Sequence, residues 1–128
     1  MTHPKDVHES TYAQAFVRDG FRCVYCDRDI LESFDTFAAS HLDHLKPSSK
    51  GGPDDDVWNR VSACGVCNNM KGAFDPCPEG LVTEETFHRV VAVARRYVTG
   101  KRSGDISCSY HRDYAHWLMK SGRKGQSL

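Results

Sequence analysis

The segment that most constrains the fold of this 128-residue chain spans residues 41–72, HLDHLKPSSKGGPDDDVWNRVSACGVCNNMKG. Residues 41–45 alternate polar and apolar side chains, which is the pattern of a half-buried strand. Residues 47–56 are rich in Pro, Ser, Gly and Asp, which favour turns. A second short strand fits residues 60–63, and a helix can begin near Cys67. The segment therefore predicts strand, polar loop, strand and helix, in that order.

Four of the six cysteines form two Cys-x-x-Cys pairs that 37 residues separate. Such pairs present thiolates on one side of a tight turn, and two pairs complete the tetrahedral shell that Zn²⁺ prefers. Disulfides or a redox dithiol are the alternative. The N-terminus, MTHPKDVHES, has no apolar segment of the kind that a secretory signal needs, so we expect a reducing cytoplasm and a structural zinc. The expected ligands are Cys23, Cys26, Cys64 and Cys67.

The remaining motifs of the segment include an Asp-His pair, a Gly-Gly pair, an isolated Asn and a Cys-x-x-Cys-Asn-x-x-Lys-Gly run. With the upstream cysteine pair, they resemble the HNH endonuclease family over roughly residues 12–72. This resemblance implies an α+β fold with a small zinc-stabilised ββα-metal core, to which this chain adds an N-terminal helix and C-terminal helices. The matching residues are Asp43-His44-Leu45-Lys46-Pro47, Gly51-Gly52, Asn59 and Cys64-Gly65-Val66-Cys67-Asn68-Asn69-Met70-Lys71-Gly72.

The resemblance also implies a reaction centre for phosphodiester cleavage. His44 would be the general base, since an imidazole, with an ordinary pKa of about 6.5, accepts protons near neutral pH. Asp43 and Asn68 would supply oxygen ligands for Mg²⁺ or Mn²⁺, and Asn59 would orient the base histidine or its loop. Asn59 and Asn68 could instead cap a turn and a helix. Adjacent residues on a regular strand point to opposite faces, so Asp43 and His44 serve one site only if the phosphate lies between them or the strand twists. His41 could reach this site or be a surface histidine.

The formal net charge is zero, but the distribution of charge is uneven. Residues 95–128 carry eight basic and two acidic residues, whereas residues 1–94 carry nine basic and fifteen acidic ones. A basic C-terminal third is consistent with a phosphate-binding arm or with a solvated helix face and tail. Lys71 could contact phosphate or close its helix. The residues expected to contact the DNA backbone are Lys50, Arg60, Lys71, Lys101 and Arg102.

Outside the central segment, the sequence predicts several further elements. A helix fits residues 10–18, with Ser10 as its N-cap. Residues 21–26 are predicted to form a short strand, and residues 27–39 a loop whose Phe34 and Phe37 are available for the core.

The C-terminal part predicts two more helices. One covers about residues 84–98, capped by Thr83, with an apolar stripe at helical spacing that packs on the body. A basic turn at residues 100–105 and a last helix at about residues 109–120 follow. We expect one domain over residues 1–128, with a core at about 12–73, a helical extension at about 81–120 and a disordered tail at 121–128.

These inferences combine into a predicted metal-dependent HNH endonuclease that nicks or cuts DNA, with Zn²⁺ in a structural role and Mg²⁺ or Mn²⁺ in catalysis. Two alternatives remain. The chain could be a zinc-stabilised module that binds nucleic acid or protein without cleavage. It could also be a nuclease subunit active only within a phage or restriction assembly. No apolar run of 18 residues is present, so no membrane partner is expected.

Overall fold

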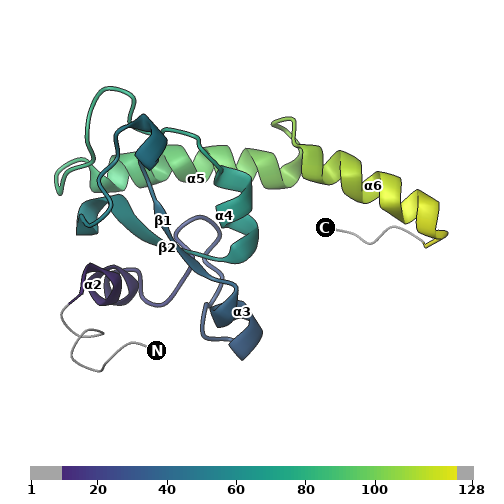
Figure 1. The fold of residues 1–128 in the computed structure, drawn as a ribbon, viewed down its shortest axis with the longest axis horizontal. Helices are drawn as coiled ribbons and strands as arrows, with labels where there is room; N and C mark the ends of the chain where they lie inside the picture. Colours follow the sequence, from purple (N-terminus) through teal and green to yellow (C-terminus); the bar gives the residue numbers. More distant parts are fainter. Residues whose placement is uncertain (1–9, 124–128) are drawn as a thin grey trace.

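A computed structural model describes residues 10–123 of the chain (Figure 1). The residues expected to fray at the N-terminus, and those from 124 onward in the expected tail, lie outside this range. The described elements are α2 (Thr11–Arg18), α3 (Phe34–Ala38), β1 (His41–His44), the 3₁₀ turns η1 (Ser48–Lys50) and η2 (Val57–Asn59), β2 (Arg60–Ala63), α4 (Gly65–Lys71), α5 (Phe87–Ser103) and α6 (Ser109–Ser121).

The centre of the fold is the β1–β2–α4 unit. The two strands pair antiparallel, with His41 opposite Ala63 and His44 opposite Arg60. The predicted order of strand, loop, strand and helix is confirmed, and so is the small α+β fold class. The helix α4 begins at Gly65, two residues earlier than expected, because Cys64 takes the extended N-cap position. A Cβ on Gly65 would lie 3.0 Å from the carbonyl oxygen of Ala39, so glycine lets this helix start pass close to the end of α3.

The helix α2 begins and ends as the sequence predicts. The Ser10 side chain accepts a hydrogen bond from the Ala13 amide at 3.1 Å, and this cap satisfies one otherwise unpaired N–H. Gly20 follows the helix with a positive φ of 64°, which glycine adopts without strain. The carboxylate of Asp19 then accepts a bond of 2.7 Å from the Ser62 amide, so the end of α2 is fixed to β2.

Two expectations for residues 21–39 are wrong. Residues 21–26 form no strand. Within the described residues, their β pairing is limited to one isolated antiparallel bridge between Arg22 and Asp29. Residues 34–38 form the short helix α3, and its N-cap Ser33 accepts a bond from the Thr36 amide at 3.0 Å. This helix turns Thr36 inward and leaves Phe34 79% and Phe37 38% exposed, so neither phenylalanine fills the core.

The helix α5 is longer than the sequence predicts. Its predicted apolar stripe is buried in the core, but the helix begins three residues later and continues to Ser103. The first four of the six residues of the turn expected at 100–105 are therefore helical. Gly100 is helical in the structure, and a Cβ there would lie 2.6 Å from the Ile106 side chain, which folds back over the helix. The buried residues of the stripe are Phe87, Val90, Ala94 and Val98.

The helix α6 follows its predicted range and projects away from the body (Figure 1). It has no buried residue, and Trp117 and Met119 are 64% and 77% exposed. Its first turn is held by His111, whose Nε2 lies 3.0 Å from the carbonyl oxygen of Lys101. In the described part of the chain, no helix has both the length and the apolar character that crossing a membrane requires.

Candidate metal centres and catalytic site

Four cysteine side chains converge between the start of α4 and the turn that follows α2. Their sulfur atoms all lie within 4.8 Å of one another, and each of the six cysteines of the chain is a free thiol. The Sγ atoms of Cys26 and Cys64 are 3.8 Å apart. A tetrahedral zinc with Zn–S bonds of about 2.3 Å separates its sulfur ligands by about 3.8 Å, so the cluster fits a Zn²⁺ ion. The four are Cys23, Cys26, Cys64 and Cys67, as the sequence predicts, whereas Cys77 and Cys108 lie outside the cluster.

The four thiols interact strongly with one another. The hydrogen bond with Cys64, followed by burial, raises the pKa of the Cys23 thiol to about 11. The same hydrogen bond stabilises the Cys64 thiolate and lowers the pKa of Cys64. A bound cation would deprotonate all four thiols, because a metal-coordinated thiol loses its proton outright.

The turn that carries Cys23 and Cys26, the N-terminal knuckle, is held from two sides. On one side the Val24 amide donates to the Ser62 carbonyl of β2 at 3.0 Å. On the other side Arg95 of α5 donates to the Val24 carbonyl at 3.0 Å and pairs with the Asp27 carboxylate. Arg102 of the same helix donates to the Cys67 sulfur at 3.7 Å. The four-cysteine cluster is therefore tied to the sheet and to α5.

Asp43, on β1, turns its carboxylate toward Tyr25 and Lys71. Its Oδ2 accepts a hydrogen bond of 2.5 Å from the Tyr25 hydroxyl and lies 3.3 Å from Nζ of Lys71. Burial, and then the Asp43 charge, raise the pKa of Tyr25 well above its ordinary value, so the phenol remains a hydrogen-bond donor. The Asp43 side chain is 13% exposed, so it is not sealed from solvent as the Lys71 side chain is.

Lys71 ends α4 with a side chain that has no exposed surface. Its Nζ also donates to the His44 carbonyl at 2.9 Å, so the short helix is fastened to β1. Burial lowers the pKa of Lys71, while the neighbouring Asp43 charge acts in the opposite direction. The expected contact of Lys71 with phosphate does not fit this geometry, because the packing of α4 on β1 covers the whole side chain.

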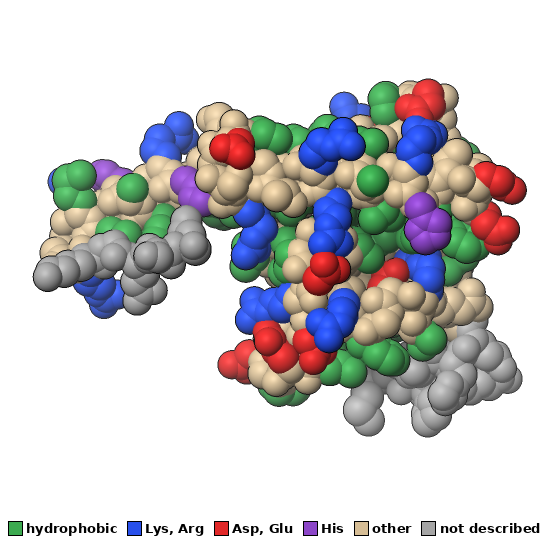
Figure 2. Space-filling model, turned by 180° about the vertical axis from the view of Figure 1, so that it is seen from behind, with side chains coloured by type: hydrophobic (Ala, Val, Ile, Leu, Met, Phe, Trp, Pro, Cys, Tyr) green, Lys and Arg blue, Asp and Glu red, His purple; other side chains and the backbone are tan. Residues whose placement is uncertain are grey.

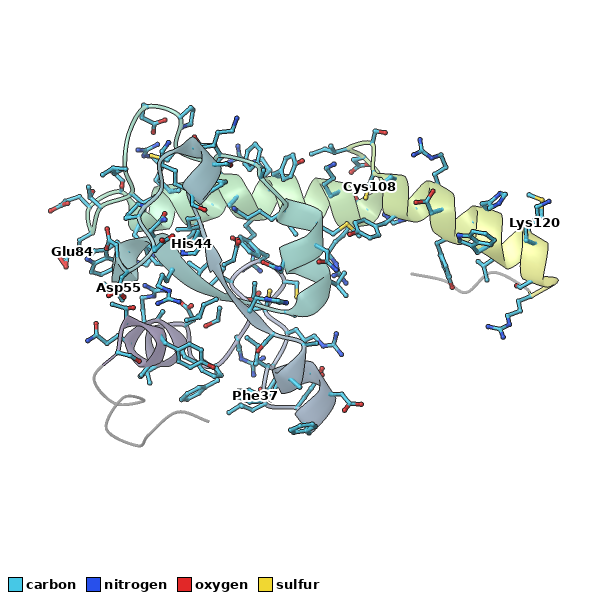
Figure 3. The ribbon with its side chains drawn as sticks, in the orientation of Figure 1. Phe37, His44, Asp55, Glu84, Cys108 and Lys120 are labelled. Atoms are coloured by element: carbon cyan, nitrogen blue, oxygen red, sulfur yellow. The ribbon has the colours of Figure 1, made fainter. Side chains whose placement is uncertain are left out.

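His44 lies at the end of β1, on the side of the polar loop (Figure 3). Its Nε2 is 3.3 Å from the Asp54 carbonyl oxygen, and its side chain is 30% exposed. A carbonyl only accepts hydrogen bonds, so Nε2 is the donor in this contact, and in the neutral ring Nδ1 is then the acceptor nitrogen. Asp43 and His44 thus have different partners on different sides of the strand, as alternation along a strand requires.

Asn59 closes the loop between the two strands. It is fully buried, and its Oδ1 accepts from the Lys46 amide at 2.8 Å. Its Nδ2 donates to the carbonyl oxygens of Lys46 and Pro53, at 3.0 and 3.1 Å. A Cβ on Gly52 would lie only 1.8 Å from the Lys46 carbonyl oxygen, which explains the need for glycine in the loop. Asn59 therefore shapes the loop beside His44, and its burial does not fit a direct part in the chemistry.

Asn68 lies in the middle of α4, where it caps neither end of the helix. Residues three apart share a helix face, so Asn68 lies on the same face as Lys71, which reaches β1. Within residues 10–123 its half-buried side chain makes no hydrogen bond, and its amide oxygen is free to accept a ligand. His41, at the other end of β1, is exposed.

The other basic residues expected at DNA differ in their surroundings. Lys50 is exposed at the end of η1. Arg60 lies opposite His44 in the sheet and donates to the Thr11 hydroxyl at 2.9 Å. Lys101 lies over the Tyr97 ring, 5.5 Å from its centroid. On the face shown in Figure 2, Lys and Arg side chains alternate with Asp and Glu, in keeping with the zero net charge.

A two-stranded antiparallel sheet followed by a helix, with a four-cysteine cluster at the helix start, is the arrangement of a small ββα-metal protein. Residues 23–74 match the model of the HNH endonuclease family, and the resemblance noted in the sequence is confirmed. Residues 23–74 are therefore similar to HNH domains, a type of domain generally found in nucleases. Neither the curated proteins nor the solved structures contain a match to the chain.

Sequence reasoning missed two polar contacts around this domain. Tyr25 reaches Asp43 from inside the N-terminal knuckle, 18 residues away in sequence. Nζ of the buried Lys46 lies 2.8 Å from the Asp75 carboxylate and 2.9 Å from the Cys77 carbonyl oxygen. No spacing pattern in the sequence signals either contact, because each joins segments that only the tertiary fold brings together.

Proposed function

We propose that this chain is a metal-dependent endonuclease that hydrolyses phosphodiester bonds in DNA. The observation that carries the proposal is the position of His44 at the end of β1, beside the loop that Asn59 holds, with Asp43 preceding it on the other side of the strand. This arrangement lies within the segment that matches the HNH endonuclease family.

His44 is the proposed general base. Its Nε2 is engaged by the Asp54 carbonyl, so Nδ1 accepts a proton from the attacking water. As that proton moves to Nδ1, the water oxygen forms a bond to phosphorus, and the bond from phosphorus to the 3′ oxygen breaks. The His44 side chain is 30% exposed, so water can approach the ring.

Asp43 and Asn68 are the proposed holders of a Mg²⁺ or Mn²⁺ ion, because carboxylate and amide oxygens are the ligands that these hard cations prefer. Such an ion, when bound, neutralises charge on the phosphate and on the departing oxygen. Arg60, which lies opposite His44 in the sheet, and Lys50, which is exposed in the loop after β1, are the proposed contacts to backbone phosphates. Phosphate contacts position the DNA without reading its sequence, so we expect low base specificity.

The test is cleavage of supercoiled plasmid DNA with Mg²⁺, with Mn²⁺ and with EDTA. We expect His44→Ala to lower the rate by about 10²–10⁴-fold, the usual contribution of a general base, with zinc content and DNA affinity unchanged. His41→Ala is the matched control, because it removes an exposed histidine from the same strand. Nicked and linear products distinguish single-strand from double-strand cutting.

Two results would contradict the proposal. Cleavage by His44→Ala at the wild-type rate would locate the chemistry elsewhere in the chain. A wild-type protein that binds DNA but cleaves neither DNA nor RNA with either metal would favour a binding module.

A further inference from the structure

Two buried donors share a single oxygen of Asp43. The Tyr25 hydroxyl lies 2.5 Å and the Lys71 ammonium 3.3 Å from Oδ2. In the part of the chain that the structure describes, Oδ1 accepts no hydrogen bond. Tyr25 is 1% exposed and the Lys71 side chain 0%, so water does not compete with either donor.

Both donors are attached to the four-cysteine cluster. Tyr25 lies between Cys23 and Cys26 in the N-terminal knuckle, and Lys71 is four residues beyond Cys67 on α4. The knuckle is fixed to β2 through the hydrogen bond from the Val24 amide. The backbone that carries each donor is therefore held by the same cluster that fits a zinc ion.

We propose that Tyr25 is a positioning residue for the catalytic metal: with Lys71 it saturates Oδ2 of Asp43, so that Oδ1 alone is presented to the divalent ion. The inference rests on the proposed function, in which Asp43 is a ligand of that ion. A carboxylate with one saturated oxygen cannot rotate freely, and it binds through its other oxygen with a fixed direction. Mg²⁺ suits this presentation, because it demands near-ideal octahedral geometry and takes only one or two carboxylates. The structural zinc site thereby sets the geometry of the reaction centre.

Removal of a hydrogen-bond partner of a metal ligand typically lowers metal affinity or activity by about 10–100-fold. Tyr25→Phe deletes only the hydroxyl and keeps the ring that packs in the core. We expect this variant to retain one zinc per chain and to bind Mn²⁺ about 10–100-fold more weakly, as measured by electron paramagnetic resonance of free Mn²⁺. Cleavage should need a correspondingly higher Mn²⁺ concentration and recover most of its maximal rate at saturation.

The matched control is Tyr97→Phe. The Tyr97 and Phe74 rings are stacked, with their centroids 3.9 Å apart. Within the described range, the Tyr97 hydroxyl makes no hydrogen bond. Its Mn²⁺ affinity should equal that of the wild type. If Tyr25→Phe fails to retain zinc, proton NMR of the wild-type protein tests the same contact. The hydroxyl proton of Tyr25, assigned by its contacts to the ring protons, should shift when Mg²⁺ binds.

Asp43→Ala separates failure of this inference from failure of the proposed function. If Asp43→Ala loses Mn²⁺ binding while Tyr25→Phe keeps the wild-type affinity, the metal site stands and the positioning role of Tyr25 is overturned. If Asp43→Ala binds Mn²⁺ as the wild type does, Asp43 is not a ligand, and both proposals fall. A Tyr25 hydroxyl resonance that Mg²⁺ leaves unmoved also overturns the positioning role.

Discussion

Replacement of Asn59 by alanine tests how the loop beside His44 is held. The change leaves the amide and carbonyl groups of the buried Lys46 without partners, together with the partly accessible carbonyl of Pro53. A buried backbone group without a partner costs about 1–3 kcal/mol, so the two groups of Lys46 predict a loss of about 2–6 kcal/mol. Water can replace the bond to Pro53, which adds little. Small domains have a free energy of unfolding of about 5–15 kcal/mol, so this loss is a large part of the total stability.

The assay is urea unfolding of the zinc-loaded protein, followed by the fluorescence of Trp58. This side chain packs on Phe87, with ring centroids 5.5 Å apart, and reports on the core. With a slope of about 2 kcal/mol per molar urea, the expected loss lowers the midpoint by about 1–3 M. Asn69→Ala is the control, because Asn69 is exposed on α4 and alanine is at least as good a helix former. An Asn59→Ala midpoint within about 0.3 M of the wild type would refute the role of the clamp.

Three further predictions concern the zinc, the projecting helix and the response to acid. We expect about one zinc per chain by elemental analysis. Cys64→Ser should leave an unfolded protein, because structural zinc supplies on the order of 10 kcal/mol of folding free energy. A disulfide between two of the four clustered cysteines in the native protein would contradict the zinc site. Deletion of residues 109–128 removes four basic residues and one acidic residue and spares the core. The slope of log DNA affinity against log salt concentration should therefore decrease in magnitude by about 1–3. An unchanged slope would mean that α6 is only a solvated helix. Burial raises the pKa of Asp75, but the hydrogen bonds from Lys46 and the Cys77 amide outweigh it and hold the pKa below its ordinary 3.8. The native state therefore binds fewer protons than the unfolded state at acid pH. The difference in free energy of unfolding between the wild type and Asp75→Asn should be full above pH 4 and vanish as the pH falls further. A difference that does not depend on pH would refute this linkage.

The sequence alone determined the order of the central elements and the identity of the four clustered cysteines. Alternating polarity defined the first strand, and the two Cys-x-x-Cys pairs defined the cluster without knowledge of the intervening loop. The buried stripe of α5 was readable for the same reason, since helical spacing is a local property. The C-terminal boundary of α5 was not readable from the sequence. Gly100 is a poor helix former, yet the helix continues through it, and the Ile106 side chain packs closely against it.

The tertiary structure decided what each polar side chain faces. Lys71 looks like a phosphate contact in the sequence, yet the packing of α4 on β1 buries it against Asp43. Phe34 looks like a core residue, yet the short helix α3 turns it to solvent. The partnership of Tyr25 with Asp43 joins the N-terminal knuckle to β1 across 18 residues, and no local pattern encodes it. Composition and spacing specify elements, whereas the direction of a side chain depends on which elements pack together.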